Sequence, residues 1–317
     1  FIRIRDQLQP GAWLPPAKAK AIAAETLRVC DPMDGLTDGV ISNYAACERR
    51  MDVAVTPDPM AAIRCPGGTD AGPNCLSDAQ MATLNRWRTA TPFGVPFLNG
   101  DTTAAGLPVG SEDKPAWIPL LPTQPDPANP PRGPASYHML ARYTDRPTKG
   151  DLTRYTPAEL RAEIAETSAL LDVPADLTAF FARGGKLIVH AAANDYLANS
   201  RAQMRFHDQV VARHGQAAVD RAVRFYVTPY APHGVASTSA TGEPLPRYAD
   251  LFAALTAWVE TGRAPGDLVQ ALEDEKAPYA VTRSRPYCRY PTYPRYKGQG
   301  DPKLAASYAC AAPGAGA

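Results

Sequence analysis

The sequence predicts an α/β fold organised around parallel strands. Apolar runs at residues 186–192 and 223–227 are typical of buried strands, and helical patterns at 200–214 and 248–261 alternate with them. Alternating strands and helices favour a parallel sheet, because a parallel connection needs a crossover of about a dozen residues. Hydrophobic residues make up 45% of the chain, which is enough to build a sizeable core.

The first 88 residues contain two helical patterns, which are separated by a polar loop bounded by cysteines. Residues 17–29 are rich in alanine and follow Pro15 and Pro16, which are acceptable at a helix start. Ser77 and Gln80 form a capping-box pattern, in which each side chain can satisfy a backbone group at the helix start. The helix that follows places large apolar residues along one side: Met81, Leu84 and Trp87.

Residues 89–150 show no periodicity, and proline recurs throughout them. So long an irregular stretch in a compact protein is usually a functional lid or a linker. We favour a lid, because the segment holds more large apolar residues than a plain linker needs: Trp117, Ile118, Tyr137, Met139 and Leu140. We therefore expect a lid domain over residues 1–178 and part of a sheet core over residues 179–317.

Glycines mark the helix ends beyond the expected lid. A short helical pattern at 176–183 stops at Gly184 and Gly185, and Gly215 and Gly262 follow the two later helical patterns. The last helix is amphipathic and carries its apolar residues on one face: Leu251, Phe252, Leu255, Trp258 and Val259.

The charge balance argues against two classes of partner. The chain carries 33 basic and 32 acidic side chains, a formal net charge of +1, which provides no long-range attraction to nucleic acid or an anionic membrane. No apolar run approaches the roughly 20 residues of a membrane span. The tail at 283–297 is rich in arginine and tyrosine, as nucleic-acid strips are, but its prolines and cysteine favour a strap packed on the domain. We expect neither nucleic acid nor membrane as a partner.

Six cysteines favour disulfides over a metal–thiolate site. None of them forms a CxxC pair, and no histidine lies near them at zinc-ligand spacing. Short loops close most easily, so the favoured pairs are Cys30–Cys47, Cys65–Cys75 and Cys288–Cys310. Six buried free thiols are the alternative. Disulfides predict an oxidising compartment, so we expect a secreted or periplasmic protein.

Asp195 and His233 each follow one of the predicted strands. Ligands of parallel α/β sheets gather at the loops that leave the carboxyl ends of the strands. The order, acid before histidine, matches the last two members of a Ser-acid-His hydrolase triad. The alternative is a loop or helix-capping aspartate and a surface-loop histidine. No G-x-S-x-G pattern occurs in the chain and Ser111, in the irregular segment, is a poor substitute, so we expect the nucleophile elsewhere.

Three carboxylates fall within eight residues, and glycines follow two of them. Hard oxygen ligands and tight glycine turns suit Ca²⁺, although the segment is not an EF-hand because it lacks a glutamate at the twelfth position. The alternative is that the aspartates form turns and helix caps. The predicted calcium ligands are the side chains of Asp31, Asp34 and Asp38 and the backbone carbonyls of Leu36 and Val40.

Together these residues resemble the tannase/feruloyl esterase family, which includes the mono(hydroxyethyl) terephthalate hydrolases. The resemblance spans almost the whole chain. Its carriers are Cys-Asp-x-x-Asp-Gly-x-x-Asp-Gly-Val-Ile at 30–41, Phe-x-Arg-Gly-Gly-Lys-Leu-Ile at 181–188, Asp195, Pro-x-x-x-His at 229–233, Trp-Val-Glu-x-Gly-x-Ala-Pro at 258–265 and Arg-x-Arg-Pro-Tyr-Cys-x-Tyr-Pro at 283–291.

The resemblance implies an α/β-hydrolase fold with a large inserted lid that holds calcium. It also implies triad roles for Asp195 and His233 and the disulfide pairing given above. The family's catalytic serine and oxyanion-hole segment belong to an N-terminal half without a counterpart here. We therefore expect the N-terminal half of the core sheet to be absent from this chain and to come from an N-terminal polypeptide of the same enzyme.

The expected function is hydrolysis of small aromatic acid esters by a triad whose serine lies outside the chain. Trp117 and Tyr137 are candidates for the lining of the acyl pocket. Two departures from the family pattern stand near the expected triad: Gly234 replaces a common cysteine, and residues 191–195 read Ala-Ala-Ala-Asn-Asp instead of His-Gly-Trp-Ala-Asp. The alternative function is a calcium-stabilised binding or structural homologue that performs no chemistry.

Overall fold

The computed structural model describes residues 6–110, 112–113, 124, 158–159, 161–234 and 236–314. Ser111, Trp117 and Tyr137 lie outside the described residues, as does most of the proline-rich segment that we expect to form a lid. The chain divides into two compact units, one formed by residues 1–25, 52–107 and 112–174, and one by residues 26–51, 108–111 and 175–317. The expected domain boundary at 178/179 stays a prediction.

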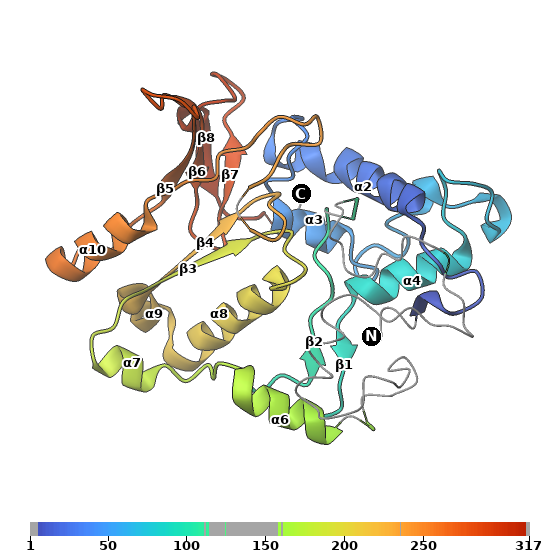
Figure 1. The fold of residues 1–317 in the computed structure, drawn as a ribbon, viewed down its shortest axis with the longest axis horizontal. Helices are drawn as coiled ribbons and strands as arrows, with labels where there is room; N and C mark the ends of the chain where they lie inside the picture. Colours follow the sequence, from blue (N-terminus) through green and yellow to red (C-terminus); the bar gives the residue numbers. More distant parts are fainter. Residues whose placement is uncertain are drawn as a thin grey trace. The chain divides into compact units, whose positions relative to one another are not determined.

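The first unit contains short helices and one small antiparallel ladder (Figure 1). The capping box at Ser77 forms: Ser77 Oγ accepts from Gln80 N at 3.3 Å and Gln80 Oε1 accepts from Ser77 N at 2.9 Å. Leu84 and Trp87 are fully buried, as the helical pattern predicts. The elements are most of α2 (Pro16–Cys30), η2 (Ala61–Ile63), η3 (Pro66–Gly68), α4 (Asp78–Arg88), β1 (Thr91–Pro92), β2 (Thr103–Ala104) and α6 (Arg161–Leu171).

The second unit is built around a pair of parallel strands. Strands β3 (Leu187–Ala192) and β4 (Val223–Thr228) run in register from Leu187 opposite Val223 to Ala192 opposite Thr228. The prediction of parallel strands is therefore confirmed. The other elements are the end of α2, η1 (Asp31–Asp34), α3 (Tyr44–Arg50), α7 (Thr178–Ala182), α8 (Ser200–His214), α9 (Gln216–Ala222), α10 (Leu251–Thr261), β5 (Leu268–Glu273), β6 (Val281–Tyr287), β7 (Tyr293–Tyr296), η5 (Ala305–Ser307) and β8 (Tyr308–Ala311).

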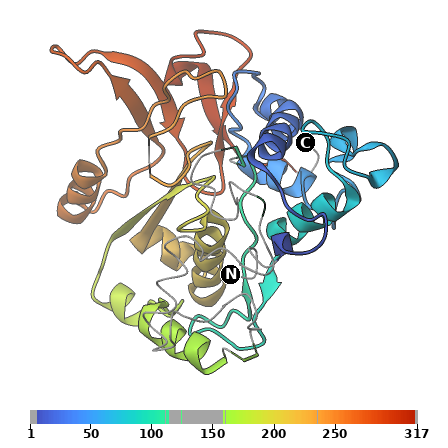
Figure 2. The ribbon, with the colours of Figure 1, turned by 45° about the vertical axis from the view of Figure 1, so that its right-hand side comes forward.

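Both faces of the strand pair are packed. Figures 1 and 2 show α8 and α9 on one side of β3 and β4 and the strands β5 to β8 on the other. Val210 of α8 and Val219 of α9 form a buried cluster with Val223 of β4. Phe225 and Val227 lie on the same face of β4 as Val223 and pack with Tyr44, Ala191, Ala193 and Tyr293. On the opposite face, the ring of Tyr226 lies 4.9 Å from that of Tyr287 of β6, and the Thr228 hydroxyl accepts from Gln270 Nε2 of β5 at 2.9 Å. Apolar residues at consecutive positions of a strand are explained by this burial on both sides.

The C-terminal hairpins are not among the predicted elements. β5 pairs antiparallel with β6, and β7 pairs antiparallel with β8. The tail packs on the core, as the strap interpretation requires: Tyr290 N donates to Phe225 O of β4 at 2.8 Å. Among the described residues, β3 pairs with β4 only, so its other edge has no partner strand there.

Helix α10 differs from its pattern. Its predicted apolar face is buried only at Trp258, which lies beneath the cationic groups of Lys186 and Arg224. The side chains of Phe252 and Val259 are 81% and 62% exposed. An amphipathic pattern predicts which face of a helix can be buried, but it does not predict which element covers that face.

All six cysteines are paired as predicted, in the bonds Cys30–Cys47, Cys65–Cys75 and Cys288–Cys310. Each bond closes a local loop, the longest spanning 22 positions. In the described part of the chain, no helix combines the length and apolar character that a membrane crossing needs.

Candidate active site

Asp195 and His233 meet at the carboxyl ends of the two parallel strands. The pairing of the strands continues into their loops, where Ala193 N donates to Thr228 O and Asn194 N donates to Ala231 O, each at 2.9 Å. These bonds hold the two loops side by side just before the two candidate catalytic residues. The parallel register therefore brings together two side chains that are 38 positions apart in sequence.

The imidazole of His233 is hydrogen-bonded to the carboxylate of Asp195. His233 Nδ1 lies 3.0 Å from Asp195 Oδ2 and 3.2 Å from Oδ1. Asp195 is buried, and its Oδ1 also accepts from Leu197 N at 2.9 Å and Ala198 N at 3.0 Å. The carboxylate is thus fixed by the backbone turn that begins at its own residue, which leaves Oδ2 for the histidine.

The His233 side chain is 55% exposed. Among the described residues, Asp195 is its only hydrogen-bonding partner, so Nε2 remains available to a reacting group. A buried acid that orients an accessible imidazole is the arrangement that general-base catalysis needs.

Asn194, which belongs to the unusual run at 191–195, makes further contacts beside the pair. The side-chain amide of Asn194 donates to the carbonyl of Val109, and Gly110 lies so close to Asn194 that a Cβ there would stand 3.0 Å from its Nδ2. Val109 N also donates to Glu48 Oε1 at 2.9 Å, and Glu48 is paired with Arg201 of α8. The position of Asn194 next to Asp195, within that run, is the signal in the sequence that marks it.

The three aspartates of the predicted calcium loop lie within the second unit and accept backbone hydrogen bonds. Asp31 Oδ2 accepts from Gly39 N at 2.9 Å, and its Oδ1 from Val40 N at 3.2 Å. Asp34 Oδ1 accepts from Leu36 N at 3.0 Å. The backbone N–H groups of Leu36 and Val40 thus face the carboxylates, whereas the predicted calcium ligands are the carbonyls of these two residues.

Asp38 completes the cluster from the other side of the turn. Its Oδ2 accepts from Arg285 Nη2 of β6 at 2.6 Å, and its Oδ1 is buried without a hydrogen-bond partner. Burial raises the pKa of Asp34 to about 7 and also raises the pKa of Asp31. Asp38 is thus paired with the Arg285 guanidinium, while Asp31 and Asp34 are partly dehydrated carboxylates that accept backbone hydrogen bonds.

These residues fit a calcium ion by their chemistry. The donor set consists of hard oxygens, one buried carboxylate oxygen lacks a partner, and the negative charge exceeds the positive charge. In the described part of the chain, no group of three or more His, Cys, Asp or Glu side chains is arranged to hold a metal ion. The carboxylates instead take backbone donors, so calcium would require them to turn toward one point.

The family model described as tannase and feruloyl esterase matches residues 4–311. The chain belongs to the tannase and feruloyl esterase family. This tannase-family chain is 28% identical over 312 residues to an uncharacterized esterase of Agrobacterium fabrum, with 94% of this chain and 53% of the relative covered. It is also 28% identical over 315 residues to a mono(2-hydroxyethyl) terephthalate hydrolase of Piscinibacter sakaiensis, with 90% and 50% covered.

Two solved structures confirm the α/β class of the fold, whereas the inserted lid and the absent N-terminal half of the core sheet stay predictions. A crystal structure of an esterase from Aspergillus oryzae matches with a TM-score of 0.74 and 21% identity, and that of feruloyl esterase B from the same organism with 0.72 and 22%. Each match covers 98% of this tannase-family chain and 61% of the solved one. The chain spans about half the length of the curated relatives it matches.

Proposed function

We propose that this chain carries the acid and the base of a carboxylic ester hydrolase that acts on small aromatic acid esters. The observation that supports this most directly is the hydrogen bond between His233 and the buried Asp195 at the ends of neighbouring parallel strands. Relatives named as a mono(2-hydroxyethyl) terephthalate hydrolase and a probable feruloyl esterase B of Aspergillus clavatus support the ester class.

In the proposed reaction, Asp195 accepts a hydrogen bond from Nδ1–H of His233, which keeps the proton on Nδ1 and leaves Nε2 as the base. Nε2 removes the proton of a serine hydroxyl as the serine oxygen attacks the ester carbonyl. The resulting imidazolium is stabilised by the Asp195 carboxylate and returns its proton to the departing alcohol. Water then attacks the acyl-enzyme with His233 again as base, and the carboxylic acid and the free serine are released.

We propose that this serine belongs to a polypeptide segment outside these 317 residues, the N-terminal part of the same enzyme. Two observations support a further segment. Strand β3 has one edge without a partner strand in the described structure, and parallel strands are normally flanked on both sides. The curated relatives are about twice as long as the matched region. That segment would also supply the oxyanion hole.

We further propose that Ca²⁺ has a structural role at Asp31, Asp34 and Asp38, with the carbonyls of Leu36 and Val40. When bound, the ion would neutralise the three carboxylates, of which Asp38 is paired with Arg285. The lid, with Trp117 and Tyr137 at the acyl pocket, is part of the same proposal. The disulfides support a secreted or periplasmic location.

The decisive experiment measures hydrolysis of a panel of aromatic acid esters by the native protein, isolated together with any polypeptide that accompanies this chain. We expect His233→Ala to abolish turnover. His214→Gln is the matched control, because His214 lies at the far end of α8, roughly 21 Å along the helix from Ser200. Unchanged turnover in folded His233→Ala protein would overturn the proposal and favour a homologue that only binds. An intact-mass measurement of the native material tests for the second polypeptide.

A further inference from the structure

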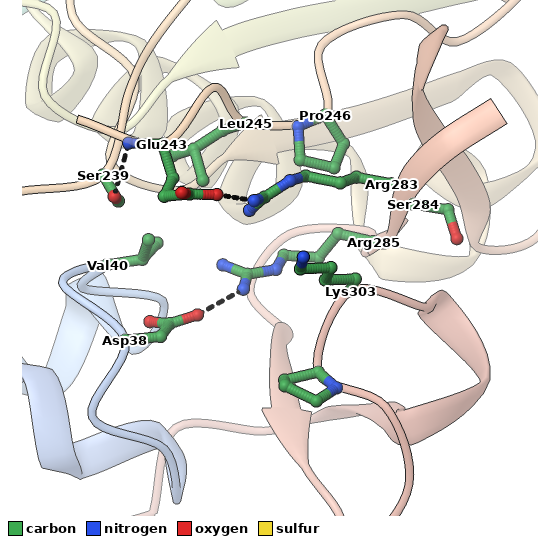
Figure 3. A pocket seen from close by; sticks show the side chains of 11 residues that line it. Asp38, Val40, Ser239, Glu243, Leu245, Pro246, Arg283, Ser284, Arg285 and Lys303 are labelled. Carbon is green, nitrogen blue, oxygen red and sulfur yellow. Dashed lines mark hydrogen bonds and ion pairs between the residues drawn. The ribbon is translucent and has the colours of Figure 1, made fainter. Parts of the chain in front are cut away.

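A cavity in the second unit is lined by residues that the proposed ester chemistry does not use. Its volume is about 190 Å³, and it lies among the turn at Asp38 and Val40, the loop that follows Ser239, strand β6 and Lys303 (Figure 3). Neither Asp195 nor His233 lines it. Since a water molecule takes about 30 Å³ of liquid, the space suits an ion of a few heavy atoms.

Strand β6 directs two arginines into this cavity. Side chains alternate along a strand, so Arg283 and Arg285, two positions apart, share one face. Figure 3 shows the two guanidinium groups entering from the same side, with the Lys303 ammonium group beside Arg285. Lys303 is held against the strand because its carbonyl accepts from Ser284 N at 2.8 Å. Three cationic groups therefore gather in one small cavity.

Protein partners satisfy these cations unequally. Arg285 is engaged by Asp38 at 2.6 Å and by the Tyr308 hydroxyl at 3.0 Å. The Arg283 side chain is only 18% exposed, and within the described residues its guanidinium pairs with Glu243 alone. A guanidinium carries five N–H donors, so most of those on Arg283 remain open. The Lys303 ammonium group has no hydrogen-bonding or ionic partner among the described residues.

The ion pair between Glu243 and Arg283 can be broken easily. Its side chain is 53% exposed, so it can turn into solvent and leave Arg283 to another anion at little cost in desolvation. Asp38 and Glu243 supply two negative charges to the lining, against three positive charges from Arg283, Arg285 and Lys303. Since Asp38 is taken by Arg285, Glu243 is the acidic residue of the lining that is left for Arg283 and Lys303, in a site where an arginine fork matches the geometry of an oxyanion.

We propose that this cavity binds a small oxyanion of the carboxylate or phosphate class. The Arg283 guanidinium donates hydrogen bonds to two oxygens of the anion. The Lys303 ammonium group and the more deeply placed Arg285 attract it electrostatically. Glu243 occupies the same donors when the anion is absent and is displaced by it. This proposal does not depend on the ester hydrolase function.

The test is isothermal titration calorimetry on the native protein with sodium sulfate, in parallel with sodium malonate as the carboxylate, at fixed calcium and matched ionic strength. We expect saturable binding of one anion, and the two titrations separate a tetrahedral inorganic anion from a carboxylate. Arg283→Gln should weaken binding by about tenfold, because a charged hydrogen bond is lost. Glu243→Gln should strengthen it severalfold, a gain that a damaged fold cannot produce.

Arg295→Gln is the control, since Arg295 is an exposed arginine of β7 that does not line the cavity. Lys303→Gln is a second variant, at an exposed position where folding is not at risk. Absence of saturable binding of both anions up to about 50 mM would overturn the proposal. So would wild-type affinity in the double variant Arg283→Gln, Lys303→Gln.

Discussion

Replacing Asp195 by asparagine tests the proposed triad through a single proton. Asp195 Oδ1 accepts from two backbone N–H groups, those of Leu197 and Ala198, so the carbonyl oxygen of an asparagine would occupy that position. The amide nitrogen would then replace Oδ2, 3.0 Å from His233 Nδ1. An amide nitrogen only donates, so Nδ1 must accept and the imidazole proton must move to Nε2.

With its proton on Nε2, the imidazole cannot accept the proton of the serine. A tautomer error of this kind costs about 10⁴-fold in kcat in serine proteases, which equals roughly 5.5 kcal/mol of activation free energy. The backbone hydrogen bonds of residue 195 are kept in Asp195→Asn, so we expect the melting temperature to change by no more than a few degrees.

The assay is the initial rate of aromatic ester hydrolysis by the native protein, with the melting temperature measured on the same preparation. Asp208→Asn is the control, because Asp208 is a carboxylate of α8 that accepts from the Tyr290 hydroxyl and faces no histidine of the proposed triad. A loss of less than tenfold in folded Asp195→Asn protein would refute the assignment of Asp195 as the residue that orients His233.

Three further predictions concern stability. A chelator should lower the melting temperature if calcium binds the aspartate cluster, and Asp34→Ala should remove that sensitivity; metal analysis without stoichiometric calcium, in protein never exposed to chelator, would contradict this. Arg285→Met should cost about 3 kcal/mol, or roughly 6 °C, because it leaves the half-buried Asp38 without its guanidinium and beside two other carboxylates; a thermal melt in calcium-free buffer measures it, and a shift under about 1 °C would show that the ion pair contributes little. Burial lowers the pKa of His190 in the folded state, so the unfolded chain binds more protons and stability should fall as the pH drops below about 6.5. His190→Phe should flatten that part of the stability curve in urea melts at several pH values, and an unchanged slope would exclude His190 as its source.

The elements that the sequence predicts well are those specified by neighbouring residues. The Ser77 capping box forms because Ser77 and Gln80 are three positions apart and can bond each other's backbone in any context. Strands β3 and β4 lie within a residue of their apolar runs, and their parallel pairing follows from the helices between them. The hairpins β5–β6 and β7–β8 escape prediction because their strands carry polar residues and prolines without a clear period.

The candidate site also has features that the sequence predicts and features that it does not. Asp195 and His233 could be paired from the sequence, because a parallel sheet places the loops after adjacent strands at one edge. The aspartates at 31, 34 and 38 could be recognised as a group because they lie within one short segment. The sequence could not show that these carboxylates accept hydrogen bonds from backbone N–H groups, because the direction of each carboxylate depends on how the turn closes.

The sequence by itself determined the local chemistry of this protein: its helix caps, its short disulfide loops and the strands that carry an acid and a histidine. Such features depend on residues a few positions apart or on one crossover, where chain connectivity limits the alternatives. Only the tertiary structure decided that Arg285 meets Asp38, 247 positions away, and that Arg283 and Lys303 open onto the same cavity. Contacts at that separation depend on how whole elements pack together, and no periodicity or motif in the chain records that packing.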